Sequence, residues 1–212
     1  MKYEAIIFDL DGVICNTDKY HFEAWKAIAD KLGIYFDEKI NNRLRGVSRM
    51  ESFNIILEKY SGVISEKEKI DYTEEKNNIY KELLSKMCER DLSDEVKETL
   101  IELRKRGLKL AIGSSSKNTK YILKQIGLEG FFDAISDGNN ITNSKPDPEV
   151  FLKAAEYLKL QPEKCMIVED AVAGIEAAIK GKMDSAAIGD ALFSNKATYN
   201  LKSFNEILII IK

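Results

Sequence analysis

Short apolar segments alternate along this chain with longer segments that show helical periodicity. The apolar segments lie at residues 5–8, 108–112, 166–168 and 186–188. Segments of this length suit strands that are buried on both faces, and an intervening helix carries the chain back so that the next strand runs parallel to the last. The alternation therefore predicts an α/β fold built on a parallel sheet.

The long stretch between the first two of these strands interrupts the alternation. It contains no strand-like run, only helical segments rich in lysine and glutamate. Two segments begin with a serine three residues before a glutamate, at Ser48 and Ser65, which is the capping box that starts a helix. We therefore expect a Rossmann-like core of residues 1–15 and 88–212, with a helical cap domain of residues 16–87 inserted after the first strand.

The composition of the chain favours a small-molecule partner. Of its 212 residues, 44% are hydrophobic and 32% are charged, which is enough apolar material for a sizeable core. The formal net charge is -3 and neither sign gathers in a block, so we expect no binding to nucleic acid or to a membrane surface. No apolar run approaches the roughly 18 residues that span a bilayer, and the N-terminus becomes acidic too early for a signal peptide. We expect a cytoplasmic monomer.

The three cysteines, Cys15, Cys88 and Cys165, are widely separated and form no CxxC pair. An odd number at such spacing fits reduced thiols in the cytosol better than a disulfide framework or a zinc site. Cys15 lies close to an acidic motif, so a functional role for this thiol stays open.

Carboxylates follow two of the predicted strands. Asp9 and Asp11 come directly after the first strand, and a further pair, Glu169 and Asp170, follows the third. The carboxyl ends of parallel strands meet at one crevice, where folds of this kind bind ligands. Two carboxylates as close as Asp9 and Asp11 cannot both stay ionised cheaply unless a cation intervenes. Magnesium suits this place, since it binds a few oxygen ligands together with substrate phosphate.

Donors for a phosphoryl group complete the pattern. Ser114 follows the second strand, and Lys145 lies in a Ser-Lys-Pro turn before a predicted helix. A hydroxyl and an ammonium can both bind phosphate oxygens. Four motifs of this chain resemble those of the haloacid dehalogenase superfamily: FDLDG at residues 8–12, the serine at 114, SKP at 144–146 and ED at 169–170.

This resemblance implies an enzyme that transfers a phosphoryl group by covalent catalysis, with Asp9 as the nucleophile and Asp11 as the general acid and base. An aspartyl phosphate would divide the transfer into two steps. The implied ligands of Mg2+ are Asp9, Asp11 through its backbone carbonyl, Glu169 and Asp170. The implied phosphate-binding residues are Ser114, Ser115 and Lys145. The second aspartate and the metal pair argue against a dehalogenase.

The helical insertion resembles the cap of the β-phosphoglucomutases in this superfamily. The resemblance lies in TDKYHFEAWKAIADKLGI from residue 17, GVSRMES from residue 46, EEKNNIY from residue 74 and, in the core, SSSKN from residue 114. It implies that Arg49 holds a phosphate remote from the metal. The substrate-binding residues that it implies are Thr17, His21, Trp25, Gly46, Val47, Ser48, Arg49, Ser52, Lys76, Ser116, Lys117 and Asn118. The expected reaction interconverts β-glucose 1-phosphate and glucose 6-phosphate through an aspartyl-phosphate enzyme and glucose 1,6-bisphosphate.

Other interpretations of these residues stay open. A sugar-phosphate phosphatase would share the core but use water as the acceptor, and a phosphate-binding regulator would show no turnover. Arg49 and Lys76 could be solvated surface residues. His21, the only histidine, could be a polar residue without a catalytic role, and Trp25 could belong to the core of the cap.

Two segments depart from the family pattern. Residues 92–95 read LSDE where the family often has Pro-Gly, and residues 189–197 read GDALFSNKA in place of a Gly-Arg-Pro type of loop. We expect the first departure to affect the hinge to the cap and the second to affect the edge of the core.

Overall fold

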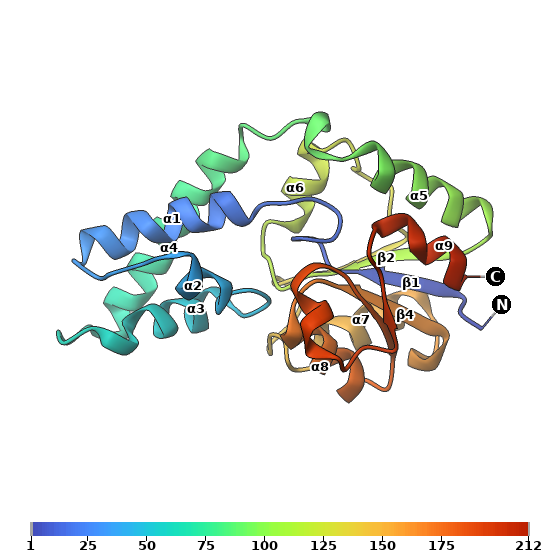
Figure 1. The fold of residues 1–212 in the computed structure, drawn as a ribbon. Coiled ribbons are helices and arrows are strands. Elements are labelled where there is room, and N and C mark those ends of the chain that lie inside the picture. The colour runs from blue at the N-terminus through green and yellow to red at the C-terminus, as the bar shows by residue number, and fades with distance from the viewer. Residues whose placement is uncertain (1, 212) are drawn as a thin grey trace.

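The computed structural model describes residues 2–211 and contains a six-stranded sheet in which all neighbours run parallel (Figure 1). The strand order is β3-β2-β1-β4-β5-β6, so β1 and β4 lie at the centre. The strands are β1 Ala5–Phe8, β2 Lys109–Gly113, β3 Ala134–Ser136, β4 Cys165–Glu169, β5 Asp184–Ala187 and β6 Tyr199–Asn200. The predicted α/β fold is confirmed, and β3 and β6 are strands that the apolar pattern did not indicate.

The central strand β1 explains why this part of the sequence is apolar at every position. Ile6 and Phe8 belong to one hydrophobic cluster, and Ala5 and Ile7 belong to a second. Successive residues of a strand point to opposite faces of the sheet, so a strand covered on both faces needs apolar residues on both. All four side chains are fully buried.

Helices cover both faces of the sheet (Figure 1). The first cluster lies under α5 Asp94–Lys105, α6 Thr119–Gln125 and α9 Ile207–Ile210, and the second lies under α7 Glu149–Leu158 and α8 Val172–Lys180. The short 3-10 helices are η1 Leu57–Lys59, η2 Glu89–Asp91, η3 Pro162–Lys164, η4 Gly189–Ser194 and η5 Phe204–Glu206.

The insertion after β1 is helical and packs around a hydrophobic cluster of its own. It contains α1 Asp18–Lys31, α2 Glu38–Asn42, α3 Arg49–Ile56 and α4 Glu66–Leu84, which lie to one side of the sheet (Figure 1). Trp25 and Phe53 stack at the centre of this cluster with ring centroids 5.9 Å apart. Both predicted capping boxes form, at Ser48 before α3 and at Ser65 before α4. These helices are called the cap below, and the predicted boundaries of a cap domain stay a prediction.

The two segments that depart from the family pattern both take up ordered structure. Ser93 accepts a hydrogen bond from the Val96 amide, so LSDE supplies the N-cap of α5. GDALFSNKA begins with η4 beyond β5. Among the helices of residues 2–211, none combines the length and the apolar character needed to cross a bilayer.

Candidate active site

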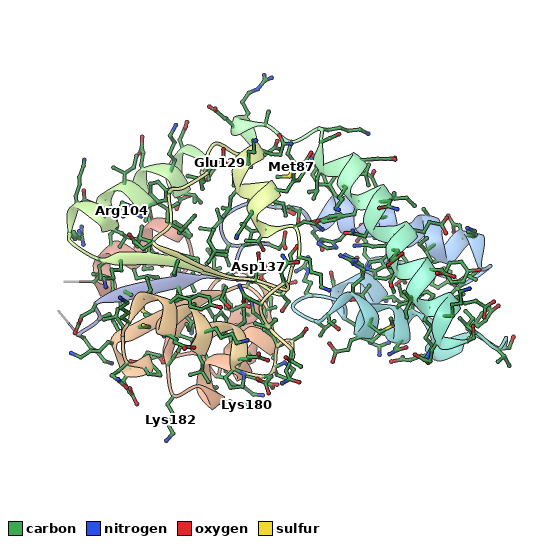
Figure 2. All side chains as sticks on the ribbon, turned by 180° about the vertical axis from the view of Figure 1, so that it is seen from behind. Met87, Arg104, Glu129, Asp137, Lys180 and Lys182 are labelled. Atoms are coloured by element: carbon green, nitrogen blue, oxygen red, sulfur yellow. The ribbon has the colours of Figure 1, made fainter. Side chains whose placement is uncertain are left out.

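Parallel pairing brings the ends of three strands to one edge of the sheet. Phe8 at the end of β1 lies in register with Ile112 of β2 and Val168 of β4. The residues that follow must therefore emerge side by side at the carboxyl edge. Figure 2 places Asp137, which directly follows β3, at this same edge on the side of the cap.

A cavity of about 610 Å³ lies between this edge and the cap helices. Most of the predicted site residues line it: Asp9, Asp11, His21, Trp25, Gly46, Val47, Ser48, Arg49, Ser52, Lys76, Ser114, Ser115, Ser116, Lys117, Asn118, Glu169 and Asp170. The two others, Thr17 and Lys145, lie behind its wall and contact residues that line it. The structure thus brings together residues that are spread over the chain from Asp9 to Asp170.

A buried lysine joins two of the carboxylates on the core wall. Lys145 Nζ lies 2.5 Å from Asp9 Oδ1 and 2.6 Å from Glu169 Oε1, and the lysine side chain is inaccessible to solvent. Burial lowers the pKa of Lys145, but the charges of Asp9 and Glu169 outweigh burial and raise it. Lys145 therefore stays protonated and can contact an anionic group beside Asp9.

The backbone leaves little freedom to Glu169. Its Oε2 accepts a hydrogen bond of 2.8 Å from the Ala171 amide, while its Oε1 accepts from Lys145. Gly174 of α8 lies so close that a Cβ at this position would come within 1.9 Å of Glu169 Oε1. Gly12, in the left-handed region with φ +81, likewise leaves room for Asp170, because a Cβ there would lie 2.1 Å from Asp170 Oδ2.

Asp9, Glu169 and Asp170 each offer an oxygen atom, and these three atoms all lie within 4.8 Å of one another. Burial raises the pKa of Asp9 to about 7 against the opposing effect of Lys145, and burial with the charge of Glu169 raises the pKa of Asp170 to about 9. When all three are ionised, Lys145 offsets one of their charges and the more distant Arg45 acts on Asp170, so an excess of negative charge remains in the site. Three carboxylate oxygens and an excess charge of this sign fit a divalent cation with oxygen ligands such as Mg2+.

Asp11 is linked to the cap through two hydroxyl groups. Thr17 Oγ1 donates a hydrogen bond to Asp11 Oδ1, and the Tyr80 hydroxyl donates to Thr17 Oγ1 over 3.2 Å. Burial raises the pKa of Asp11, and the hydrogen bond from Thr17 lowers it in part. The pKa of Asp11 is thus shifted upward, in the direction that favours a group which must both donate and accept a proton.

The cap wall carries positive charge where the core wall carries negative charge. Lys76 Nζ lies 2.8 Å from His21 Nδ1 and contacts the faces of the Trp25 and Tyr80 rings at 5.0 and 4.4 Å. Burial and the nearby Arg49 charge lower the pKa of Lys76, and burial followed by the Lys76 charge lowers the pKa of His21. His21 is therefore neutral at neutral pH.

Arg49 and Lys76 have no carboxylate partner within 4 Å among residues 2–211. Arg49 instead donates to the amide oxygen of Asn77 over 2.8 Å, and burial lowers its pKa. Two basic side chains without an ion-pair partner can together bind an anionic group of a ligand.

The loop of residues 114–118 completes the cavity from the core side. Ser114 Oγ accepts a hydrogen bond from the Ser116 amide, and Ser116 Oγ accepts from the Asn118 amide, so the loop is held by its own hydroxyl groups. Ser115 Oγ donates to the Gly46 carbonyl over 3.0 Å, which joins this loop directly to the cap.

The structure shows the surroundings of the residues for which the sequence left alternatives. Trp25 is only 2% exposed and stacks on Phe53, so most of its surface belongs to the cap core although its edge lines the cavity. Burial raises the pKa of Cys15 well above its usual value, so this thiol stays protonated and is a poor nucleophile. Lys76 is buried and Arg49 is half-buried, and both line the cavity.

Sequence reasoning missed some residues of the site. Tyr80 lies four residues after Lys76 on α4, and this helical spacing could have indicated that both face the cavity. Arg45 pairs with Asp18 of the cap and Asp190 of the core at 3.0 and 2.5 Å, and no pattern in the sequence connects these three positions.

Comparison with known proteins gives a consistent result. A family model described as haloacid dehalogenase-like hydrolase matches residues 6–188. A β-phosphoglucomutase of Bacillus subtilis is 40% identical over 88% of this chain and 83% of its own length, and a phosphorylated carbohydrates phosphatase of Thermotoga maritima is 33% identical over 99% of this chain and 98% of its own length. The crystal structure of a β-phosphoglucomutase from Clostridium difficile matches with a TM-score of 0.91 and 41% identity, covering 97% of this chain and 93% of that one.

The matched region contains the carboxylates, the serine and the lysine that form the core wall of the cavity. The relatives span nearly the whole chain, cap included, so the match does not rest on the core alone. The chain is therefore an enzyme that belongs to the haloacid dehalogenase-like hydrolase family.

Proposed function

We propose that this enzyme is a magnesium-dependent β-phosphoglucomutase. The observation that carries the proposal is the pair of cations on the cap wall, Arg49 and Lys76, which face a cavity whose opposite wall holds the carboxylates. A substrate with a phosphate at each end matches two such walls, because one phosphate reacts at Asp9 while the other binds the cap. The relatives named β-phosphoglucomutase, which cover the cap as well as the core, support the same proposal.

In the first half of the proposed reaction, Asp9 attacks the phosphorus of glucose 1,6-bisphosphate or of another phosphate donor. A bond forms between its carboxylate oxygen and phosphorus, the ester P–O bond breaks, and Asp11 gives its proton to the leaving oxygen. Lys145 and Ser114 hold the oxygens of the transferring group. Mg2+, held by Asp9, the Asp11 carbonyl, Glu169 and Asp170, would supply positive charge to those oxygens.

In the second half, a hydroxyl group of the sugar takes the place of the leaving oxygen. Asp11 now accepts the proton of this hydroxyl, the hydroxyl oxygen attacks the aspartyl phosphate, and Asp9 leaves as a free carboxylate. The sugar must present its two ends in turn, and Arg49 binds whichever phosphate is not reacting. The Tyr80–Thr17–Asp11 contacts give the cap a means to position the acid and base for either end.

A sugar-phosphate phosphatase is the second candidate, favoured by the similarity to the phosphorylated carbohydrates phosphatase of Thermotoga maritima. In that reaction water takes the place of the sugar hydroxyl in the second half. A catalytically silent regulator is a poorer fit, because Asp9, Asp11 and both metal carboxylates are present and brought together.

Replacement of Arg49 tests the observation that carries the proposal. Arg49→Ala removes a hydrogen bond from a charged group, which is worth about 1.5 to 3 kcal/mol, so activity on β-glucose 1-phosphate should fall by about tenfold or more. Hydrolysis of acetyl phosphate, which is too small to reach the cap, should change little. Equal losses on both substrates would indicate a folding defect, and no loss on either would contradict a role for Arg49 in binding phosphate.

A further inference from the structure

Asn77 joins the cap to the core through a single atom. Its amide oxygen accepts a hydrogen bond of 2.8 Å from Arg49 Nη2 and another of 3.0 Å from Asn118 Nδ2. Arg49 is the first residue of α3 in the cap, whereas Asn118 is the residue before α6 in the core. One acceptor on α4 thus fixes two donors that reach the cavity from different parts of the fold.

The neutral charge of this acceptor matters because Arg49 forms no ion pair with a carboxylate of residues 2–211. A carboxylate at position 77 would orient Arg49 equally well, but it would also neutralise the guanidinium and repel an incoming phosphate. A neutral amide oxygen accepts the hydrogen bond and leaves the positive charge available. Asn118 is 6% exposed, so its amide group has few other positions to adopt.

We infer that Asn77 is a positioning residue for the phosphate that binds remote from the metal. It holds Arg49 in the direction of the cavity and sets its distance from Asn118, so that donors from the cap and from the core converge on the same phosphate. Since no carboxylate within residues 2–211 forms an ion pair with Arg49, its charge stays available to the bound phosphate. This inference rests on the proposed function, because it requires a phosphate at the cap end of the substrate.

Two substitutions at this position separate orientation from charge. Asn77→Ala removes the acceptor, and we expect KM for β-glucose 1-phosphate to rise by about threefold to tenfold, less than in Arg49→Ala, because Asn77 positions Arg49 and does not itself contact the phosphate. Asn77→Asp keeps an acceptor but adds a negative charge, and we expect KM to rise by more than in Asn77→Ala, to about tenfold or above. In both variants kcat should stay within about twofold, because the reacting groups are on the core.

The matched control is Asn78→Asp, which adds the same charge at the next, exposed position of α4 and should leave KM unchanged. Acetyl phosphate hydrolysis by all three variants should keep its rate, which would show that the core is intact. A merely structural role for Asn77 would lower kcat on both substrates through loss of folded enzyme and leave KM unchanged, and that result would overturn the inference.

Arg49→Ala, measured in parallel, keeps this inference distinct from the proposed function. If Arg49→Ala raises KM for β-glucose 1-phosphate and neither Asn77 variant does, the result supports a phosphate site at Arg49 and contradicts the inferred role of Asn77. If none of these variants changes KM, the cap does not bind a phosphate through Arg49, and the observation that carries the proposed function is contradicted.

Discussion

Two buried lysines show how neighbouring groups set the charge of a side chain in this site. Lys145 is fully buried, and Asp9 and Glu169 raise its pKa in spite of that burial. Lys76 is 2% exposed, and its pKa is lowered by burial and by Arg49. Lys145 therefore offsets part of the negative charge of the core wall. Lys76 has no carboxylate within ion-pair distance among residues 2–211, and its ammonium group lies against the neutral His21 ring.

Protonation of His21 should destabilise the cap, which can be measured. Its pKa in the folded protein lies below its ordinary value of about 6.5, so the unfolded chain takes up a proton that the folded chain does not as pH falls through 6.5. The contribution of His21 to the free energy of unfolding should therefore decrease between pH 7 and pH 5, by at most about 1.4 kcal/mol per pH unit, while the raised pKa values of Asp9, Asp11 and Asp170 act in the opposite direction. Urea denaturation isolates this contribution as a difference: as pH falls, the unsubstituted protein should lose stability relative to His21→Gln. Identical pH dependence of the two proteins would contradict the burial of a neutral His21.

At the scale of elements, helix α8 positions Glu169, one of the carboxylates proposed to bind Mg2+, by its close approach to β4. Glu169 is the last residue of β4, and Gly174 on α8 contacts it with no side chain between them. Glu169 is also tied to Lys145 and to the Ala171 amide, so it cannot move aside without losing these hydrogen bonds. The absence of a side chain at position 174 is therefore a condition for the site.

We predict that Gly174→Ala weakens Mg2+ binding while the protein stays folded. A Cβ at this position would lie 1.9 Å from Glu169 Oε1, so the carboxylate must rotate out of the site. We expect the concentration of Mg2+ that gives half-maximal activity to rise by about tenfold or more, the effect of about 1.4 kcal/mol. Gly181→Ala, at the C-terminal end of the same helix with φ -78, is the matched control. Equal Mg2+ requirements in the two variants would show that Glu169 is not a ligand.

At the scale of the whole molecule, contacts across the cavity hold the cap against the core. Arg45, between α2 and α3, pairs with Asp190 of η4 in the core and also with Asp18 on its own side of the cavity, and Ser115 donates a hydrogen bond to Gly46. Both aspartates are partly exposed, so each ion pair contributes at most about 1 kcal/mol. Contacts of this strength can hold a closed cap and still allow it to open for substrate.

Loss of the Arg45 ion pairs should loosen the cap without unfolding the core. In Arg45→Ala we expect amide hydrogen exchange in residues 43–48 and in η4 to become up to about fivefold faster, whereas exchange in β1 and β4 stays unchanged. Arg43→Ala is the control, because Arg43 pairs with Glu58 inside the cap. Equal exchange in the two variants would show that the pairs formed by Arg45 do not hold the cap closed.

Local patterns predicted those parts of the molecule that depend on neighbouring residues in the chain. The fully buried runs of β1 and β4, the capping boxes at Ser48 and Ser65, and the polar residues after the strands all have local signals. β3 and β6 were missed because three and two residues are too few to show a period.

Parts of the site that depend on distant residues could not be predicted in this way. Asn77 accepts hydrogen bonds from residues 28 and 41 positions away, and Arg45 reaches an aspartate 145 positions away. Each of these side chains is unremarkable in the sequence, since asparagine and arginine are common on solvated helices and loops. Only the pairing of the strands and the position of the cap bring them to one cavity.

The proposed function is tested most directly by measuring which product receives the phosphoryl group of β-glucose 1-phosphate. The enzyme is incubated with β-glucose 1-phosphate, Mg2+ and a trace of glucose 1,6-bisphosphate, and glucose 6-phosphate and inorganic phosphate are measured in the same samples. A mutase forms glucose 6-phosphate in large excess over inorganic phosphate, and Asp9→Asn, which lacks the nucleophile, forms neither. Release of inorganic phosphate in step with substrate consumption, without glucose 6-phosphate, would contradict the proposed mutase and identify a phosphatase.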